Sequence, residues 1–252
     1  MIPLNRQQTV HYTNQTLMKS KKTNPCDHSC LMCRYVLQDW LGQIDLHRKN
    51  IKLKKGEQFI TEGESVRGIY FIQSGLVKVH RNLGDKETIV RFAKKGDIVG
   101  HRGISTEQTV YPISATTLEV SQLCFVEMPF FLSTLRINPE LSYRLMLFFA
   151  DELHLSEQKM TRLTQLAVKN RLAWSLLLLH RVFSEGHKDG YIGLSLSKKD
   201  LASYVGATYE TVYRTLSELI ELGAIIMDKK DIFIKNLQLL QDLSEENNGE
   251  LN

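Results

Sequence analysis

The feature that most constrains the fold is a change in hydrophobic period along the chain. Between about residues 51 and 128, short runs rich in Ile, Val, Phe and Tyr alternate between apolar and polar positions and are separated by glycines. Alternation with a period of two is typical of half-buried strands, and many short strands at close spacing predict an antiparallel barrel or sandwich. The expected strands are 58–61, 68–73, 76–81, 88–93 and 120–126.

After this segment the period becomes that of a helix. From about Pro139, apolar residues recur at alternating spacings of three and four, which is typical of a helix that pairs with a second helix. One ordinary amphipathic helix packed on its own β domain would give the same pattern. The expected seam, interrupted by one polar residue, is Met146, Phe149, Leu153, Ser156, Met160, Leu163 and Ala167.

The last third of the chain contains two capped helices joined by a glycine turn. Ser197 is the expected N-cap of the first helix, which Gly206 ends, and Thr208 caps a second helix over 209–222. A β-hairpin around 228–231 follows. Helix, short turn, helix and hairpin is the order of a winged helix-turn-helix, whose second helix enters the DNA major groove by its N-terminal residues.

The front of the second helix carries the side chains expected to read DNA. Arg214 can offer two donors to guanine, Glu210 can accept from cytosine, and the start of the first helix suits phosphates. A Glu210–Arg214 surface pair, four residues apart, is the alternative, but its place at the front of a capped helix favours base recognition. The expected DNA-binding residues are Ser197, Lys198, Lys199, Thr208, Tyr209, Glu210, Tyr213 and Arg214.

Net charge alone does not indicate a nucleic-acid partner. The chain carries a formal charge of +4, and residues 195–240 contain six Lys and Arg against six Asp and Glu. The placement of the bases must therefore carry DNA binding. No run approaches the ~20 apolar residues that span a bilayer, and the polar N-terminus lacks a signal peptide, so a cytoplasmic protein without a membrane partner is expected. No familiar catalytic motif is present, so no enzyme is expected.

Over residues ~26–240 the chain resembles the Crp/Fnr family of bacterial transcription regulators. The resemblance rests on the motifs Leu53-x-Lys55-Gly56-Glu57, Ser74-Gly75-x-Val77-Lys78-Val79, Gly96-Asp97-x-x-Gly100, Ser197-x-x-Asp200-Leu201-Ala202 and Glu210-Thr211-Val212-Tyr213-Arg214. It implies an α+β fold: an N-terminal antiparallel β-barrel of the cyclic-nucleotide-binding jelly-roll type, a long dimerisation helix and a C-terminal winged helix-turn-helix. It also implies a homodimer that binds palindromic double-stranded DNA and works with RNA polymerase.

These expectations divide the chain into five parts. Residues 1–50 form a tail and a cysteine-containing segment, 51–132 the β-barrel sensor, and 133–167 the dimerisation helix. Residues 168–240 form the winged helix-turn-helix. Residues 241–252, which contain four acids and no base, form an acidic tail.

Three of the four cysteines fall within eight residues. In a reducing compartment, Cys26, Cys30 and Cys33 with the distant Cys124 indicate a metal or redox site more than a disulfide framework. The spacing resembles the Fnr branch of the family, which implies a 4Fe–4S cluster. That branch has a further ligating cysteine where this chain has Asp39, so either Cys26 or Asp39 would complete the set. Zinc, a thiol switch or four ordinary thiols are the alternatives.

Two other signals are weighed against the cysteines. Members that bind a cyclic nucleotide have a phosphate-binding arginine where this chain has Ile113, and Gly100 is not followed by Glu-Leu. Because an apolar side chain cannot pair with phosphate, a cyclic nucleotide is not expected. A small molecule or haem in the barrel is the remaining alternative, with His80, His101 and Tyr111 as candidate ligands.

Overall fold

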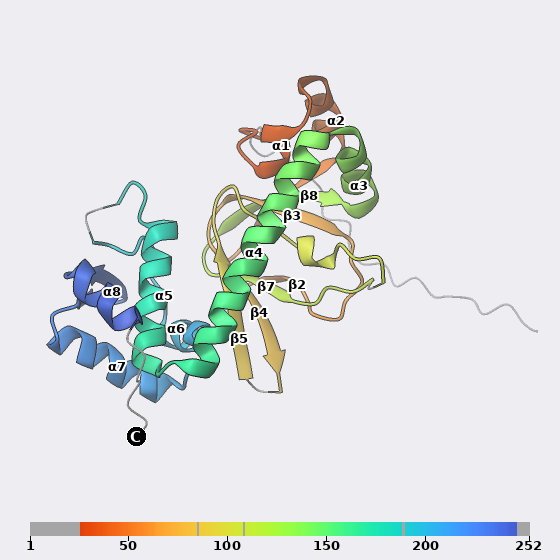
Figure 1. The fold of residues 1–252 in the computed structure, drawn as a ribbon. Helices are drawn as coiled ribbons and strands as arrows, with labels where there is room; N and C mark the ends of the chain where they lie inside the picture. Colours follow the sequence, from red (N-terminus) through yellow and green to blue (C-terminus); the bar gives the residue numbers. More distant parts are fainter. Residues whose placement is uncertain (1–25, 85, 108, 188–189, 246–252) are drawn as a thin grey trace, which may run out of the picture.

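The computed structural model describes residues 26–84, 86–107, 109–187 and 190–245 (Figure 1). The expected N-terminal tail over residues 1–25 and the last seven residues of the expected acidic tail lie outside these ranges. The described chain forms a β domain (residues 48–127) and a helical C-terminal domain (residues 168–245), with a long helix running between them. In the described residues, no helix is both long and apolar enough to cross a membrane.

The β domain consists of two four-stranded antiparallel sheets. Their strand orders are β1-β8-β3-β6 and β2-β7-β4-β5, so the predicted barrel or sandwich is an open jelly roll and not a closed barrel. The predicted strands are confirmed to within three residues at each end. The strands are Arg48–Leu53 (β1), Gln58–Ile60 (β2), Gly68–Ser74 (β3), Val77–Leu83 (β4), Lys86–Ala93 (β5), Ile98–Val99 (β6), Ser114–Thr117 (β7) and Ser121–Glu127 (β8).

Strand β3 is buried on both faces and joins two cores. Ile69 and Phe71 point into a cluster that includes residues of the flanking helices, whereas Tyr70 and Ile72 point into the space between the sheets. Successive side chains of a strand point to opposite faces, so a strand with two covered faces has a continuous apolar run. The helices that cover the outer face are Leu31–Tyr35 (α1), Leu41–His47 (α2), Met128–Ile137 (α3) and Pro139–Gln165 (α4).

Asn138 separates α3 from the long helix α4, which begins at Pro139. Proline has no amide hydrogen to donate, and Pro139 occupies the first turn of α4, where none is needed. The side chain of Asn138 accepts from the amide of Leu37 at 2.7 Å and donates to the carbonyl of Thr134 at 2.8 Å. The predicted dimerisation segment 133–167 therefore contains the end of α3 as well as α4, and Ala167 lies beyond α4 as the N-cap of α5.

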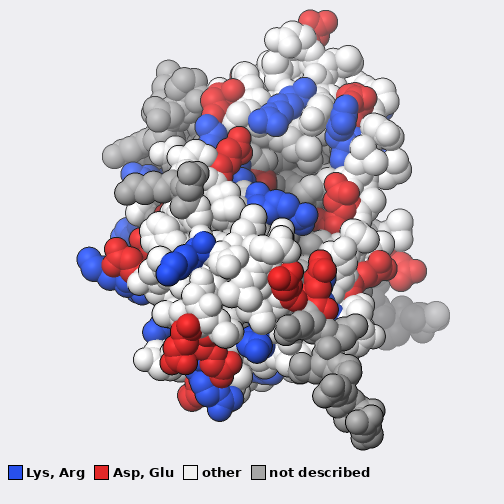
Figure 2. All heavy atoms as spheres, turned by 60° about the vertical axis from the view of Figure 1, so that its left-hand side comes forward, with Lys and Arg blue, Asp and Glu red and all other residues white. Residues whose placement is uncertain are grey.

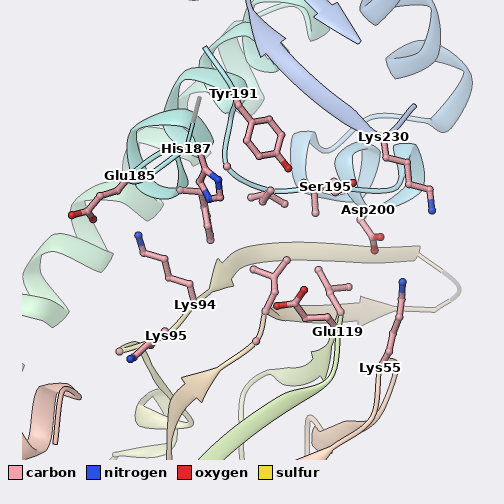
Figure 3. A pocket seen from close by; sticks show the side chains of 18 of the residues that line it. Lys55, Lys94, Lys95, Glu119, Glu185, His187, Tyr191, Ser195, Asp200 and Lys230 are labelled. Atoms are coloured by element: carbon pink, nitrogen blue, oxygen red, sulfur yellow. The ribbon is translucent and has the colours of Figure 1, made fainter. Parts of the chain in front are cut away.

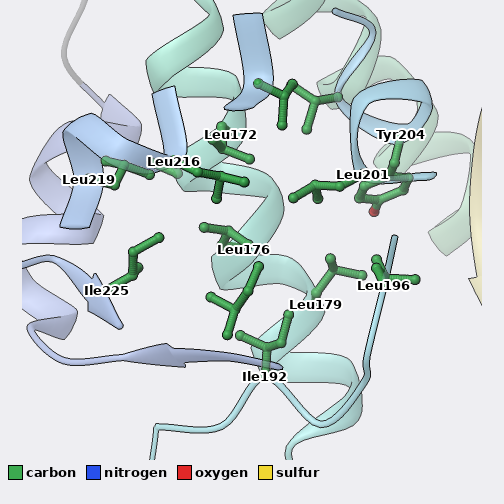
Figure 4. Packing of buried hydrophobic residues seen from close by; sticks show 14 of the residues in the cluster. Leu172, Leu176, Leu179, Ile192, Leu196, Leu201, Tyr204, Leu216, Leu219 and Ile225 are labelled. Atoms are coloured by element: carbon green, nitrogen blue, oxygen red, sulfur yellow. The ribbon is translucent and has the colours of Figure 1, made fainter. Parts of the chain in front are cut away.

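The C-terminal domain has the predicted order of a winged helix-turn-helix, with a shared apolar core (Figure 4). Between α5 and α6, Tyr191 forms a single β-bridge with Phe233. The last helix continues to Glu245 and buries Leu243, so residues 241–245 are packed and do not form a tail. The elements are Val168–Phe183 (α5), Lys198–Val205 (α6), Tyr209–Glu221 (α7), Ile225–Asp228 (β9), Asp231–Ile234 (β10) and Leu237–Glu245 (α8).

Candidate DNA-reading surface and cysteine cluster

The two helices of the predicted DNA-reading motif begin where their caps predict. The hydroxyl of Ser197 accepts from the amide of Asp200 at 3.0 Å, and the hydroxyl of Thr208 accepts from the amide of Thr211 at 3.2 Å. Gly206 ends α6 with φ of 74°, a left-handed conformation that favours glycine. These local signals fix the turn between α6 and α7 and hence the direction in which α7 points.

Helix α7 buries one side and exposes the other. Val212, Leu216 and Leu219 are at most 2% exposed and anchor the helix against the domain core. The predicted reading residues lie on the outer side, where Tyr209 and Tyr213 are about half exposed and their rings stack at 6.3 Å between centroids. The apolar side of the helix thus anchors it to the domain core, and the polar side stays accessible at the protein surface.

The structure joins α6 to this surface through Lys198. Its ammonium lies 4.2 Å from the centroid of the Tyr213 ring, a cation–π contact between the two helices of the motif. Lys199 is exposed at the start of α6. The Ser197 hydroxyl, by contrast, is committed to the cap and to the Asp200 carboxylate, so its expected contribution to DNA binding is limited to the helix start that it caps.

Arg214 forms a different surface pair from the alternative that the sequence suggests. Its Nε lies 3.9 Å from a carboxylate oxygen of Glu218, one turn further along, and not beside Glu210. The Arg214 side chain is 75% exposed, and an exposed pair of this kind contributes only ~0.3–0.5 kcal/mol. Arg214 can therefore exchange this partner for a base edge at small cost, and Glu210 stays exposed at the front of the helix.

The charge pattern of the surface agrees with the neutral count of the motif. Figure 2 shows basic and acidic side chains interspersed on the face that it displays, without one continuous basic patch. A motif with equal numbers of basic and acidic side chains attracts the DNA backbone weakly at long range, so DNA binding by this motif would depend more on specific contacts.

The four cysteines lie in or against one apolar cluster on the outer face of the β1-β8-β3-β6 sheet. Cys30 is the N-cap of α1, and its sulfur accepts from the amide of Cys33 at 3.5 Å. Cys124 is in the middle of β8, opposite Asn50 of β1 and Phe71 of β3. Cys30, Cys33 and Cys124 are at most 7% exposed and share one apolar cluster, against which Cys26 packs.

The thiols perturb one another. A hydrogen bond from Cys33 to Cys26 lowers the pKa of Cys26 to about 6 and raises the pKa of Cys33, which donates. Burial raises the pKa of Cys124 to about 12, and negative charge on Cys30 and Cys26 adds to that rise. Arg48 offsets part of this effect, since its positive charge lowers the pKa of both Cys26 and Cys124. The sulfurs are therefore close enough to sense each other's charge.

His28 is a candidate ligand that the sequence analysis missed. A ligand atom of His28 lies within 4.8 Å of the sulfurs of Cys26 and Cys33, and the backbone at His28 adopts φ of 51°. The pattern Cys-x-His-x-Cys-x2-Cys was the available signal. Asp39 lies in the exposed turn Gln38–Trp40 (η1) and is not part of this group of three, and neither are Cys30 and Cys124.

The candidate ligands for a molecule in the β domain already have partners within the protein. The Tyr111 hydroxyl donates to the carbonyl of Gly68 at 2.8 Å and accepts from two amides, and Ile113 is buried in the core between the sheets. His80 contacts Thr116 at 2.9 Å. His101, in the turn His101–Gly103 (η2), contacts the Glu152 carboxylate of α4 at 3.0 Å. Each of the three candidate ligands thus already makes a contact within the protein, and Ile113 is part of the apolar core.

Comparison with known proteins assigns a family to this fold. Residues 50–138 match the cyclic nucleotide-binding domain family, and residues 170–243 match the Crp-like helix-turn-helix domain family. The chain is 30% identical over 227 residues to the fumarate nitrate reduction regulatory protein of Klebsiella oxytoca, which covers 87% of this chain and 88% of that protein.

Two further relatives agree with this assignment. The transcriptional activator protein FnrA of Stutzerimonas stutzeri is 28% identical over 209 residues, 81% of this chain and 84% of FnrA. The structure of FixK2 from Bradyrhizobium japonicum superimposes with a TM-score of 0.71 at 24% identity, over 79% of this chain and 98% of FixK2. These matches show that the chain belongs to the Crp/Fnr family of DNA-binding transcription regulators, whose members are not enzymes.

Proposed function

We propose that this regulator binds palindromic DNA as a homodimer through α7 and that its signal acts at Cys26, Cys30, Cys33 and Cys124. The observation that carries the proposal is the pairing of two built features in one chain. One is a capped, anchored α7 with its expected reading side chains exposed, and the other is a group of four thiols, three of them buried, in the cluster that α1 and α4 cover.

The exposed face of α4 supports the dimer. Met146, Leu153 and Met160 are 57%, 61% and 69% exposed, which is unusual for large apolar side chains on a regular helix. They lie at the predicted seam positions together with the exposed Ser156. Phe149 and Leu163 also contact their own chain, against His101 and beside the Gly206 turn. A second copy of α4 would cover this face in a coiled-coil arrangement.

The four thiols support a metal group. They share one apolar cluster, and the pKa of Cys26 is lowered, an environment in which thiolates can hold a 4Fe–4S cluster. In this proposal Cys26, Cys30, Cys33 and Cys124 are the four ligands, and Cys26 takes the place of the ligand that the family has at Asp39. Such a cluster would make the site responsive to oxygen and redox potential, in keeping with relatives named anaerobic regulatory proteins.

Helix α1 connects the thiols to α4. It packs directly on α4, and the guanidinium of Arg144 lies 5.0 Å from the centroid of the Tyr35 ring at the end of α1. A change in the packing of α1 therefore reaches the dimer helix first. We infer that it shifts the α4 pair and thereby sets the spacing of two α7 helices, which must match half-sites ~34–36 Å apart.

Zinc is the second candidate, because His28 joins Cys26 and Cys33 in the tightest group of ligand atoms. Two or three sulfurs with one imidazole form a common tetrahedral zinc site. The visible spectrum of anaerobically purified protein, with iron, zinc and sulfide analysis, separates the two. Broad brown absorbance with iron and sulfide supports the cluster. One zinc per chain without iron selects the zinc site, and metal-free protein contradicts both.

DNA binding by the dimer is tested by a band-shift titration against random-sequence DNA at several salt concentrations. We expect selection of a palindromic site and a linear fall of log affinity with log salt. Absence of any selected sequence, under both reducing anaerobic and aerobic conditions, would contradict the proposed function. RNA polymerase is the partner expected if the bound dimer acts as an activator, as FnrA is named to do.

A further inference from the structure

A cleft of about 1060 Å³ separates the β domain from the C-terminal domain (Figure 3). Four turns at one end of the β domain form one wall: those between β1 and β2, β3 and β4, β5 and β6, and β7 and β8. The chain between α5 and α6 and the turn of the β9–β10 wing form the opposite wall. The cleft is distinct from the α7 surface, and it adjoins the cysteine segment, since Ser29 and Arg34 also line it.

Basic side chains reach the cleft from both walls. Its lining contains five Lys and Arg side chains against three carboxylates, with His187 in addition. Several of these charges are already paired. Lys95 contacts Asp27 at 2.6 Å, Lys94 donates to the carbonyl of Val182, and Asp200 contacts Lys78, outside the cleft, at 3.2 Å.

Arg34, Lys55 and Lys230 are the three cations of the lining that remain. Lys55 comes from the β1–β2 turn and Lys230 from the wing, and Figure 3 shows them extending toward the cleft from opposite walls. Neither forms an ion pair within the part of the chain that the structure describes. The lining also contains the carboxylates of Glu119, Glu185 and Asp200, but its five basic side chains still exceed its acidic ones by two, and a bound anion would offset this excess of positive charge.

Besides serines and glycines, the lining contains a group of apolar and aromatic side chains. Leu76 and Leu118 of the β domain face Phe183, Leu194 and Tyr191 of the C-terminal domain. A pocket of this size with an apolar lining and a few convergent charges is typical of sites for small organic ligands. We propose that the cleft binds an organic phosphate with an apolar ring: Lys55 and Lys230 pair with the phosphates, and the apolar side chains contact the ring.

This ligand would act on DNA binding because it touches both domains, an effect that rests on the proposed function of the chain. Lys230 belongs to the wing, and Ser197 and Asp200 of the lining belong to the start of α6. Bridging them to the β domain would fix the orientation of the DNA-reading motif. By linkage, a ligand that prefers one orientation changes DNA affinity by the same factor by which DNA changes ligand affinity.

The test is calorimetric titration of the full chain with ATP, and separately with pyrophosphate, as probes of this chemistry. We expect ATP to bind and Lys55→Gln and Lys230→Gln each to weaken it by about tenfold, the effect of losing one charge-assisted contact. Lys52→Gln and Lys229→Gln are matched controls, because these exposed neighbours do not line the cleft, and we expect less than about a twofold change.

Two results would overturn the proposal. The first is calorimetric: neither probe gives a heat of binding at millimolar concentration, or ATP binds and the two cleft variants do not weaken its binding. The other concerns the phosphates of DNA as the alternative source of the anion. If ATP does not bind and Lys55→Gln lowers the salt dependence of DNA binding, the cleft belongs to the path of the DNA. Sequence-specific DNA binding by the unliganded protein is measured separately, so failure here leaves the proposed function testable.

Discussion

At the scale of single residues, Arg214 and Lys198 have different expected roles although both are basic. Arg214 projects freely from α7, so Arg214→Ala should lose about 1–3 kcal/mol of discrimination at one base pair. Lys198 lies over the Tyr213 ring beside the helix start, so Lys198→Ala should weaken all sequences alike. Band shifts with a site and its single-base variants measure both. A sequence-selective loss for Lys198→Ala would contradict this assignment.

Glu152 makes the stability of the protein depend on acidity. Burial alone would raise its pKa, but the hydrogen bond with His101 and the charges of Arg91 and Arg102 outweigh burial and lower the pKa to about 2. A lowered carboxyl pKa gives stability that is present above the ordinary value of 4.5 and is lost as pH falls toward 2, by about 3 kcal/mol in all.

Urea unfolding across this pH window measures the effect. The free energy of unfolding should fall with acidification more steeply for the wild type than for Glu152→Gln, which cannot titrate there. Equal slopes would show that Glu152 is not held ionised by its three partners. Glu140→Gln, at an exposed carboxylate on the same helix, is the matched control.

The residue scale also shows what the sequence could and could not predict. Caps at Ser197 and Thr208 and the buried side of α7 depend on neighbours within a few positions, and these predictions are confirmed. Arg48 beside the thiols and the Arg91–Glu152 contact at 2.8 Å join segments far apart in the sequence. No local pattern contains that information, so these contacts were not predicted.

At the scale of elements, the seam of α4 is interrupted by one polar side chain. Ser156→Leu would complete the apolar face, and burying a leucine on each subunit should lower the dimer dissociation constant by at least about tenfold. Sedimentation equilibrium measures this constant. Thr161→Leu, exposed on the same helix outside the predicted seam, should leave it unchanged. An equal constant for Ser156→Leu and wild type would contradict the seam assignment.

Lys159 of α4 joins the two domains. Its ammonium donates to the carbonyls of Ile89 at 2.8 Å and Val90 at 3.3 Å, where the pairing of β4 with β5 shifts by one residue. It also lies 3.9 Å from the centroid of the Tyr204 ring in α6. Burial lowers the pKa of Lys159 to about 7. The β-bulge thus frees backbone acceptors that a lysine from another element satisfies.

Lys159→Met should loosen this junction without emptying the space. Hydrogen exchange of the α6 amides should become about tenfold faster, since about 1.4 kcal/mol of local stability corresponds to that factor. Lys169→Met, at a half-buried lysine of α5, is the control. Unchanged exchange in α6 would show that the other interdomain contacts, such as that of Phe92 with Tyr204 at 5.1 Å between ring centroids, hold α6 without Lys159.

At the scale of the whole molecule, the order of domains follows from the changes of hydrophobic period, but their arrangement does not. The core of the C-terminal domain extends to Ile89 and Phe92 of β5, and Lys78 of β4 contacts Asp200 of α6. Such docking depends on complementary pairs of surfaces. Each surface alone has the sequence pattern of an ordinary half-buried strand or helix. The interdomain cleft and the closeness of Cys124 to α1 follow from this arrangement.

In the proposed mechanism, a group bound by the thiols controls the affinity of the protein for DNA. The most direct measurement records the visible spectrum and the affinity for the selected palindrome on the same anaerobic sample, before and after exposure to air. We predict brown absorbance that fades in air together with the loss of specific DNA binding. The Cys124→Ser protein should be colourless and should bind the palindrome weakly under both conditions. Colourless, iron-free wild-type protein with the same DNA affinity before and after air would contradict it.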